Sequence, residues 1–200
     1  MSDAAGLAPR ALLQRQRVLD AAERCFVASG FHAASIADIA AEARMSPGLI
    51  YRYFKNKNAI VKGIIDRRLQ ERCRAIEDLD DSGGMLRALL QAFDCWRRMD
   101  NPKMNVALFL EMTAAATRDA EIAKLTRTAD EFVRNGLQQT VQRIASAHGV
   151  VLSGAALRSR TLILQCLIEG LSTRAVHQPK INRVVLEAAL ERVIAAVVTA

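Results

Sequence analysis

Apolar residues recur along the chain at intervals of three and four positions, and no segment alternates apolar and polar residues for long. A spacing of three to four is the period of an α-helix that buries one face, whereas alternation would indicate a strand. The pattern therefore predicts an all-α protein of about nine helices. The predicted helices cover residues 10–29, 35–43, 46–54, 56–79, 85–99, 102–117, 119–147, 153–177 and 181–199.

Local signals place the boundaries of the first helices. Gly30 is predicted to end the first helix in a left-handed conformation. Ser35, followed three residues later by Asp38, resembles a capping box at the start of the second helix. Ser46 and Pro47 place an N-cap residue before a proline in the first helical position, which proline favours. The second and third predicted helices are therefore short and joined by a tight turn.

The positive charge is concentrated around this turn. The chain of 200 residues has a net charge of +7. Nine of the 28 basic residues and two of the 21 acidic residues lie between positions 44 and 74, so this segment carries the whole excess. A local basic block is typical of a surface that binds phosphate, although a solvated helix face would give a similar pattern.

Composition excludes several other classes of protein. The N-terminus has no continuous apolar segment typical of a secretory signal, and no uncharged run is long enough to span a bilayer. The four cysteines lie far apart without a CxxC pair, which suits packing in a reducing cytoplasm. The three histidines lack metal-ligand spacing, and no nucleophile, base and orienting acid come together in a motif. We expect no enzyme activity, no metal, no cofactor and no membrane segment.

The two short helices, with an earlier helix to brace them, match a helix-turn-helix unit, whose second helix lies in the DNA major groove. Hydroxyls and free N–H groups at the helix starts, at Ser35 and Ser46, can bind phosphate. Tyr51 and Tyr53 offer donors to the DNA backbone, but each could also be a half-buried packing residue. Many ordinary helical hairpins share this pattern. The candidate DNA-binding residues are Ser35, Arg44, Ser46, Pro47, Gly48, Tyr51, Arg52, Tyr53, Lys55 and Lys57.

The segment SIADIAAEARMSPGLIYRYFKNKNAI, residues 35–60, resembles the DNA-binding signature of the TetR family of bacterial transcriptional regulators. The preceding RVLDAAERCFVASGF, residues 17–31, is similar to the first helix of that family. LIEGLSTRA, residues 167–175, is similar to the eighth helix of regulators of the choline–betaine type. The resemblance implies a DNA-binding domain over residues 10–57 and a ligand-binding and dimerisation domain over residues 58–200.

Arg44 departs from this resemblance, because the family usually has glycine in the turn. If the position requires a positive φ, arginine costs roughly 1 kcal/mol there. Its guanidinium would also lie beside the DNA. Arg44 is therefore either an added phosphate contact or a substitution that merely faces solvent.

The resemblance implies that the second domain binds an effector and a second copy of the chain. The last two helices carry more apolar residues than one helix stripe buries, although some of these must cover the protomer's own core. Glu111 and Glu169 lie in apolar runs, where a carboxylate could balance a cationic effector. Glu169 could instead pair with Arg174 or with an arginine of another helix. Candidate effector-binding residues are Phe93, Trp96, Phe109, Met112, Phe132, Gln165 and Glu169. Candidate dimer residues are Leu162, Cys166, Val185, Leu190, Ile194 and Val197.

These observations predict a homodimeric, ligand-responsive transcription factor of the cytoplasm, a repressor rather than an activator. Its expected partners are double-stranded DNA at a pseudo-palindromic operator and a small, mostly apolar effector. The alternative is a helical dimerisation or scaffold protein without specific DNA binding. That alternative would explain the helical pattern, but not the concentration of charge around the turn.

Overall fold

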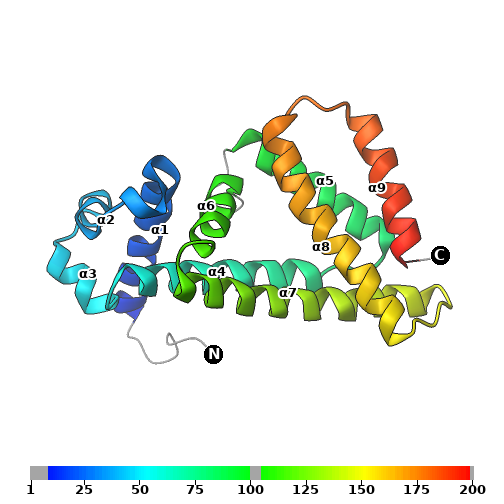
Figure 1. The fold of residues 1–200 in the computed structure, drawn as a ribbon, viewed down its shortest axis with the longest axis horizontal. Helices are drawn as coiled ribbons and strands as arrows, with labels where there is room; N and C mark the ends of the chain where they lie inside the picture. Colours follow the sequence, from blue (N-terminus) through cyan, green and yellow to red (C-terminus); the bar gives the residue numbers. More distant parts are fainter. Residues whose placement is uncertain (1–8, 100–104, 199–200) are drawn as a thin grey trace. The chain divides into compact units, whose positions relative to one another are not determined.

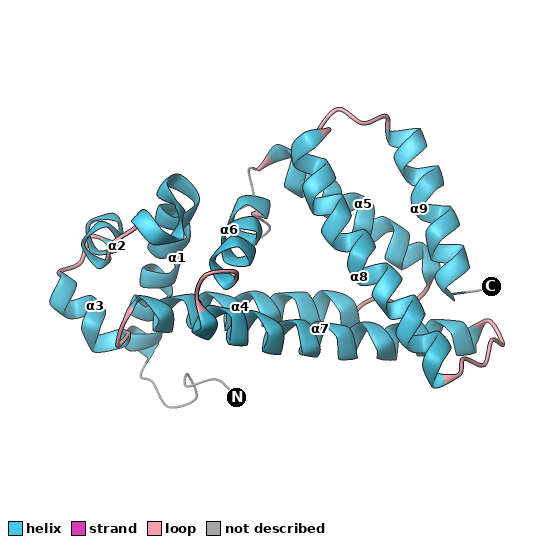
Figure 2. Ribbon diagram, viewed as in Figure 1, coloured by secondary structure: helices cyan, strands magenta, loops and turns pink. Residues whose placement is uncertain are grey.

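The computed structural model describes residues 9–99 and 105–198, which contain nine α-helices and no strand (Figures 1 and 2). The predicted all-α class is confirmed, and most helix boundaries agree to within a few residues. The predicted start of the sixth helix and the end of the ninth lie outside the described residues. The helices are α1 (Pro9–Ala33), α2 (Ile36–Ala43), α3 (Pro47–Tyr53), α4 (Lys57–Glu77), α5 (Ser82–Arg98), α6 (Val106–Ala116), α7 (Ala120–Ala147), α8 (Gly154–His177) and α9 (Arg183–Val198).

The chain divides into two compact units. Of the described residues, the first unit contains 9–69 and 107–129, and the second contains 70–99, 105–106 and 130–198. This division differs from the expected boundary at residue 57, because Ile60, Val61 and Ile64 of α4 are buried in the core of the first unit. Residues of α6 and α7 join the same core.

The core of the first unit is built from one face of each of its helices. Phe26 of α1, Ile39 of α2, Ile50 of α3 and Ile60 of α4 are all fully buried, and Leu108 of α6 is 4% exposed. Burying one such side chain contributes about 1.5–3 kcal/mol. Because α2 and α3 have only eight and seven residues, this shared core, rather than helix propensity, holds them in place.

The core of the second unit lies between α5, α8 and α9, which pack against one another. Phe93 of α5, Leu164 of α8 and Leu190 of α9 are at most 2% exposed, and Ile144 adds a side chain from α7. Figure 1 shows these three helices side by side. No described helix is long and apolar enough to cross a membrane.

Gly30 corrects one local prediction. It does not end α1 in a left-handed helical conformation but has φ 79° and ψ 159°, after which the helix resumes to Ala33. This region of conformational space is essentially restricted to glycine. The Gly30 corner therefore bends α1 rather than ending it.

Candidate DNA interface

The start of α2 carries the predicted capping box. The Ser35 hydroxyl accepts a hydrogen bond from the Asp38 amide at 3.1 Å, and Asp38 Oδ2 accepts from the Ser35 amide at 2.8 Å. The Ser35 hydroxyl also donates to Asp38 Oδ2 at 2.6 Å. Hydrogen bonds from Ser35 lower the pKa of Asp38. These contacts fix the exposed Ser35 at the helix start.

The turn between α2 and α3 is a Schellman motif with Arg44 in the left-handed position. Arg44 has φ 53° and ψ 51°. Its amide donates to the Ala41 carbonyl at 3.0 Å, and the Met45 amide donates to the Ala40 carbonyl at 2.9 Å. Glycine usually occupies this position, because it adopts a positive φ without strain. Arg44 therefore has the left-handed conformation that is unfavourable for arginine.

The start of α3 also agrees with the sequence prediction. Ser46 is the N-cap, its hydroxyl accepts from the Leu49 amide at 3.3 Å, and Pro47 occupies the first turn. Apart from its two chain neighbours and the backbone of its own helix, no atom lies within 4 Å of where a Cβ of Gly48 would stand. The first turn of α3 is therefore open to an approaching molecule.

One face of α3 is buried and the other is exposed. Ile50 and the adjoining Phe54 are at most 2% exposed, whereas Tyr51 is 56% exposed. Tyr53 is half-buried against the core, so packing accounts for much of its ring. Eight of the ten candidate DNA-binding residues are exposed, namely Ser35, Arg44, Ser46, Pro47, Gly48, Tyr51, Arg52 and Lys55.

Lys57 has a structural role that the sequence did not indicate. Its ammonium donates to the carbonyls of Phe31 at 2.8 Å, Ala34 at 3.1 Å and His32 at 3.3 Å. The same group lies 4.4 Å from the centroid of the Phe31 ring. Burial lowers the pKa of Lys57. The three carbonyls use all three donors of the ammonium, so Lys57 fastens the end of α1 to the start of α4.

Two arginines of α1 donate hydrogen bonds to carbonyls at the C-terminal ends of α2 and α3. Arg17 donates to the Ala43 carbonyl at the end of α2 at 2.9 Å, and Arg15 donates to the Tyr53 carbonyl at the end of α3 at 3.1 Å. The Arg15 guanidinium also lies 4.3 Å from the centroid of the Phe54 ring. A cation at a helix C-terminus complements the free carbonyls and the dipole. The sequence shows these arginines on α1, but it contains no signal for the carbonyls they reach.

An ion network around the buried Glu23 joins α1 to α4. The Glu23 carboxylate, 8% exposed, lies 2.8 Å from the Arg67 guanidinium and also pairs with Arg68. Arg67 also contacts Asp20 at 2.6 Å. Burial lowers the pKa of Arg67, but the two carboxylates outweigh burial and raise it. Part of the basic block that the sequence placed beside the turn therefore stabilises the unit internally.

The carboxylate of Glu111 has a partner within the first unit. Glu111 Oε2, on α6, accepts a hydrogen bond from the Phe31 amide at 3.1 Å, beside the Gly30 corner. Glu111 therefore has a structural contact in the first unit, and its role toward an effector stays a prediction.

The apolar candidates for effector binding are divided between the units. Phe109 and Met112 belong to the first unit, and Met112 is 7% exposed in its core, so Met112 has a packing role. In the second unit Phe93 is 2% exposed, Trp96 is half-buried beside the same core, and Phe132 is 58% exposed. The structure therefore brings together Phe93 and Trp96, but not the whole apolar set.

The polar candidates lie on α8 near charged residues of the same unit. Gln165 donates to Asp130 Oδ1 at 2.9 Å. Removal from water lowers the pKa of Arg72, while the charges of Asp130 and Glu169 act in the opposite direction. Among the described residues no ion pair joins Glu169 to Arg174. Arg72 is therefore a cation near Glu169, and the negative charge of Glu169 acts to raise the pKa of Arg72.

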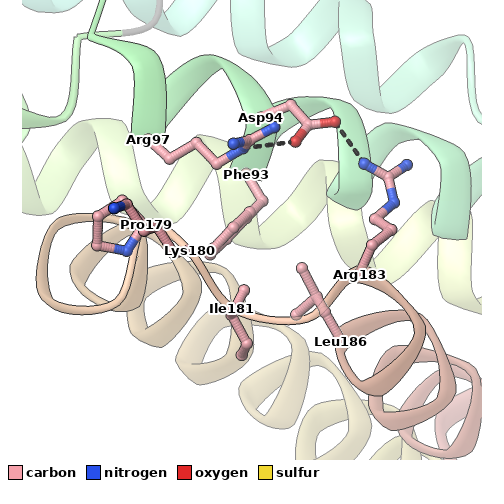
Figure 3. Close-up of a pocket in the computed structure, with 8 residues that line it drawn as sticks. All are labelled: Phe93, Asp94, Arg97, Pro179, Lys180, Ile181, Arg183 and Leu186. Carbon is pink, nitrogen blue, oxygen red and sulfur yellow. Dashed lines mark hydrogen bonds and ion pairs between the residues drawn. The ribbon is translucent and has the colours of Figure 1, made fainter.

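A surface cavity of about 280 Å³ lies between α5 and the segment that joins α8 to α9. Figure 3 shows Asp94 between two arginines: it accepts from Arg97 Nε at 2.8 Å and pairs with Arg183. Burial raises the pKa of Asp94, but the hydrogen bonds from both arginines outweigh it and hold that pKa below its usual value. These contacts fasten the start of α9 to α5. The cavity is lined by Phe93, Asp94, Arg97, Pro179, Lys180, Ile181, Arg183 and Leu186.

The candidate dimer residues divide into an exposed and a buried set. Leu162 is 59% exposed, Val185 is 61% exposed, and Cys166 is also exposed. By contrast, three candidates on α9 are at most 3% exposed, because they pack into the core of their own unit; these are Leu190, Ile194 and Val197. Those three side chains are therefore core residues. The large apolar side chains left exposed on α8 and α9 are Leu162, Ile163, Val184 and Val185.

Known proteins resemble both parts of the chain. The sequence profile described as "Bacterial regulatory proteins, tetR family" matches residues 18–64, and that described as "BetI-type transcriptional repressor, C-terminal" matches residues 83–199. The transcriptional regulator UidR of Escherichia coli K12 is 28% identical over 141 residues, which are 64% of this chain and 67% of UidR. The nicotine-responsive repressor HdnoR of Paenarthrobacter nicotinovorans is 29% identical over 117 residues, which are 58% and 60% of the two chains. GusR of Salmonella enterica has the same fold, with a TM-score of 0.81 at 22% identity over 97% of this chain and 98% of GusR.

Proposed function

Because this chain belongs to the TetR family of bacterial helix-turn-helix transcriptional regulators, we propose that it is a homodimeric repressor. It binds a pseudo-palindromic operator and leaves the DNA when a small, mostly apolar effector occupies its second unit. The observation that carries the proposal is the exposed face of α3, which is held on a fully buried Ile50.

The proposed DNA contacts follow from the chemistry of that face. The Ser46 hydroxyl stands at a helix N-terminus, where free amides and the positive end of the helix dipole favour phosphate. Ser35 caps α2 in the same way, but its hydroxyl already donates to Asp38, so the proposed contact there does not use that hydrogen. Gly48 and Tyr51 lie on the exposed side that would enter the major groove, and Lys55 supplies charge at its end. Arg52, Pro47 and Tyr53 complete the proposed surface, with Tyr53 contributing only its polar edge. Lys57 can add charge near the DNA, but the proposal does not require it to leave its carbonyl partners.

The proposed dimer uses the exposed apolar residues of α8 and α9. Leu162, Cys166 and Val185 would meet the same residues of a second copy around a two-fold axis. Such a dimer would present two copies of α3 to half-sites about 34–36 Å apart, one turn of DNA.

The proposed effector site lies in the second unit near Trp96, Phe93 and Phe132, with Gln165 and Glu169 as polar anchors. The half-buried Trp96 beside the α5–α8–α9 core supports an apolar ligand, whereas Phe93 is itself a residue of that core. The charge of Glu169 acts on Arg72, and this pair of opposite charges supports a polar end group. Phe109 lies in the first unit and stays a weaker candidate.

Selection of bound duplexes from a random DNA pool tests the proposal. The full chain is expected to recover an inverted repeat with half-site centres about one helical turn apart. Recovery of sequences with no common pattern, at any salt concentration that allows binding, would contradict specific operator recognition.

A further inference from the structure

We infer that Arg44 binds a phosphate of the operator backbone, and that the chain keeps an arginine in a left-handed position for this contact. The inference rests on the proposed function, and it adds a contact at the one turn position where the family usually has glycine. It concerns the partner of a single side chain, not the recognition of base sequence.

The backbone of the turn gives no reason for an arginine. The left-handed conformation completes the hydrogen bonds of the Schellman motif, and glycine would adopt it without strain. Of all non-glycine residues in the described part of the chain, only Arg44 and Met99 have a positive φ. Strained backbone conformations cluster at functional sites, so an outlier that nothing in the fold explains motivates a functional hypothesis.

The fold does not require this side chain. Arg44 is exposed, and within the described residues its guanidinium has no carboxylate or carbonyl partner. It therefore contributes neither burial nor an ion pair that would offset the strain.

The surroundings of Arg44 leave its charge uncompensated. It borders a polar groove of about 310 Å³, whose lining residues are Arg17, Asp20, Arg24, Glu42, Ala43 and Arg44. Both carboxylates of the groove already have partners, since Asp20 pairs with Arg67 at 2.6 Å and Glu42 with Arg24 at 2.6 Å. Arg17 donates to Gln14 and to the Ala43 carbonyl. Arg44 is thus a lining residue of the groove whose guanidinium has no partner among the described residues and can bind an anion.

The place of Arg44 in the chain selects the anion. Arg44 lies in the turn between α2 and α3, two residues before Ser46, the N-cap of α3. The anion that approaches a helix-turn-helix unit at this point is the phosphate backbone of DNA. An arginine at this position therefore adds one phosphate contact to each protomer.

The expected effect follows from counterion release. One phosphate contact changes the slope of log K against log salt by about 0.9. If the affinities with and without the contact are equal at about 1 M salt, the contact strengthens binding roughly 8-fold per protomer at 0.1 M salt and roughly 4-fold at 0.2 M. Arg44→Gly removes the strain as well as the charge. It should therefore raise the Tm by about 2–4 °C while it weakens DNA binding.

The test uses the full chain, a duplex recovered by selection with the wild type, and a random-sequence duplex of equal length, over 0.05–0.3 M salt as an approximate range. Arg44→Gly and Arg44→Asn should both lower the slope by about 0.9 per protomer, whereas Arg44→Lys should keep the slope. Arg24→Gln is the matched control, because it removes a guanidinium of the same groove that is already paired with Glu42. Equal slopes for Arg44→Gly and the wild type would overturn the inference, as would an equal loss in Arg24→Gln. A wild type without salt-dependent binding to either duplex would instead overturn the proposed function.

Discussion

Lys57 and Lys55 are two residues apart, yet the structure assigns them different roles. The ammonium of Lys57 donates to three carbonyls at the end of α1, whereas Lys55 is exposed and has no protein partner among the described residues. Replacing each lysine by methionine keeps most of the aliphatic chain and removes the charge. We expect Lys57→Met to destabilise the protein and Lys55→Met to leave its stability unchanged.

The size of the effect can be worked out from the contacts of Lys57. A hydrogen bond to a charged group contributes about 1.5–3 kcal/mol when it is shielded from water. Lys57 is only half-buried, and the freed carbonyls can be hydrated, so the three bonds together are expected to contribute about 2 kcal/mol. The contact with the Phe31 ring adds about 0.5 kcal/mol. For a chain of this size, about 2.5 kcal/mol corresponds to a fall in Tm of about 5–10 °C.

Thermal and urea unfolding, followed by circular dichroism, measure the change. Lys55→Met should stay within about 0.5 kcal/mol of the wild type, as surface substitutions do. It should still weaken DNA binding, because it removes a proposed phosphate contact. Equal stability of the two variants would refute the assignment of Lys57 to the α1 end.

Three further predictions concern other contacts. Glu23→Gln leaves two guanidiniums of α4 without their shared carboxylate, and it should destabilise the protein by about 3 kcal/mol in urea unfolding. Asp94→Asn should destabilise the protein above about pH 4, and the difference from the wild type should shrink as the pH falls further, because the folded-state pKa of Asp94 lies below its unfolded value. Leu162→Glu should lower the molecular mass in sedimentation from dimer to monomer, with the helix content unchanged.

Each of these has a matched control or a contradicting result. Ser159→Ala lies on the same helix as Leu162, is also exposed, and should leave the sedimentation of the dimer unchanged. A difference between Asp94→Asn and the wild type that grows on acidification would contradict the lowered pKa. Wild-type stability in Glu23→Gln would show that the ion network adds nothing over a neutral hydrogen-bonding side chain.

Short-range signals in the sequence predicted the fold well. Ser35 with Asp38, and Ser46 with Pro47, each act within one helical turn, so their effect can be read from neighbouring residues alone. For Arg44 the sequence supported only a conditional expectation, from the glycine that the family usually has in the turn, and the structure shows that the condition of a positive φ is met.

Long-range packing explains what the sequence could not provide. Nothing near Lys57 in the chain indicates that its partners lie 23 to 26 residues earlier. In α9, apolar residues occur on more than one face, so periodicity could not separate the buried Leu190 from the exposed Val185. The apolar pattern also could not show whether Met112 binds an effector or packs in a core. The sequence analysis predicted an effector contact, and the structure buries Met112 in the core of the first unit. The end of a helix can be predicted from its own residues, but the partner of a side chain depends on the whole fold.

The affinity of a double variant for the selected duplex tests the central claim most directly. Tyr51→Ala combined with Lys55→Ala removes two exposed side chains beside the buried face of α3 and should leave the core intact. If α3 reads the operator, the variant keeps the Tm of the wild type within about 2 °C and loses at least about 10-fold in affinity for the selected duplex. A folded variant that binds this duplex as tightly as the wild type, in the same salt, would contradict the account.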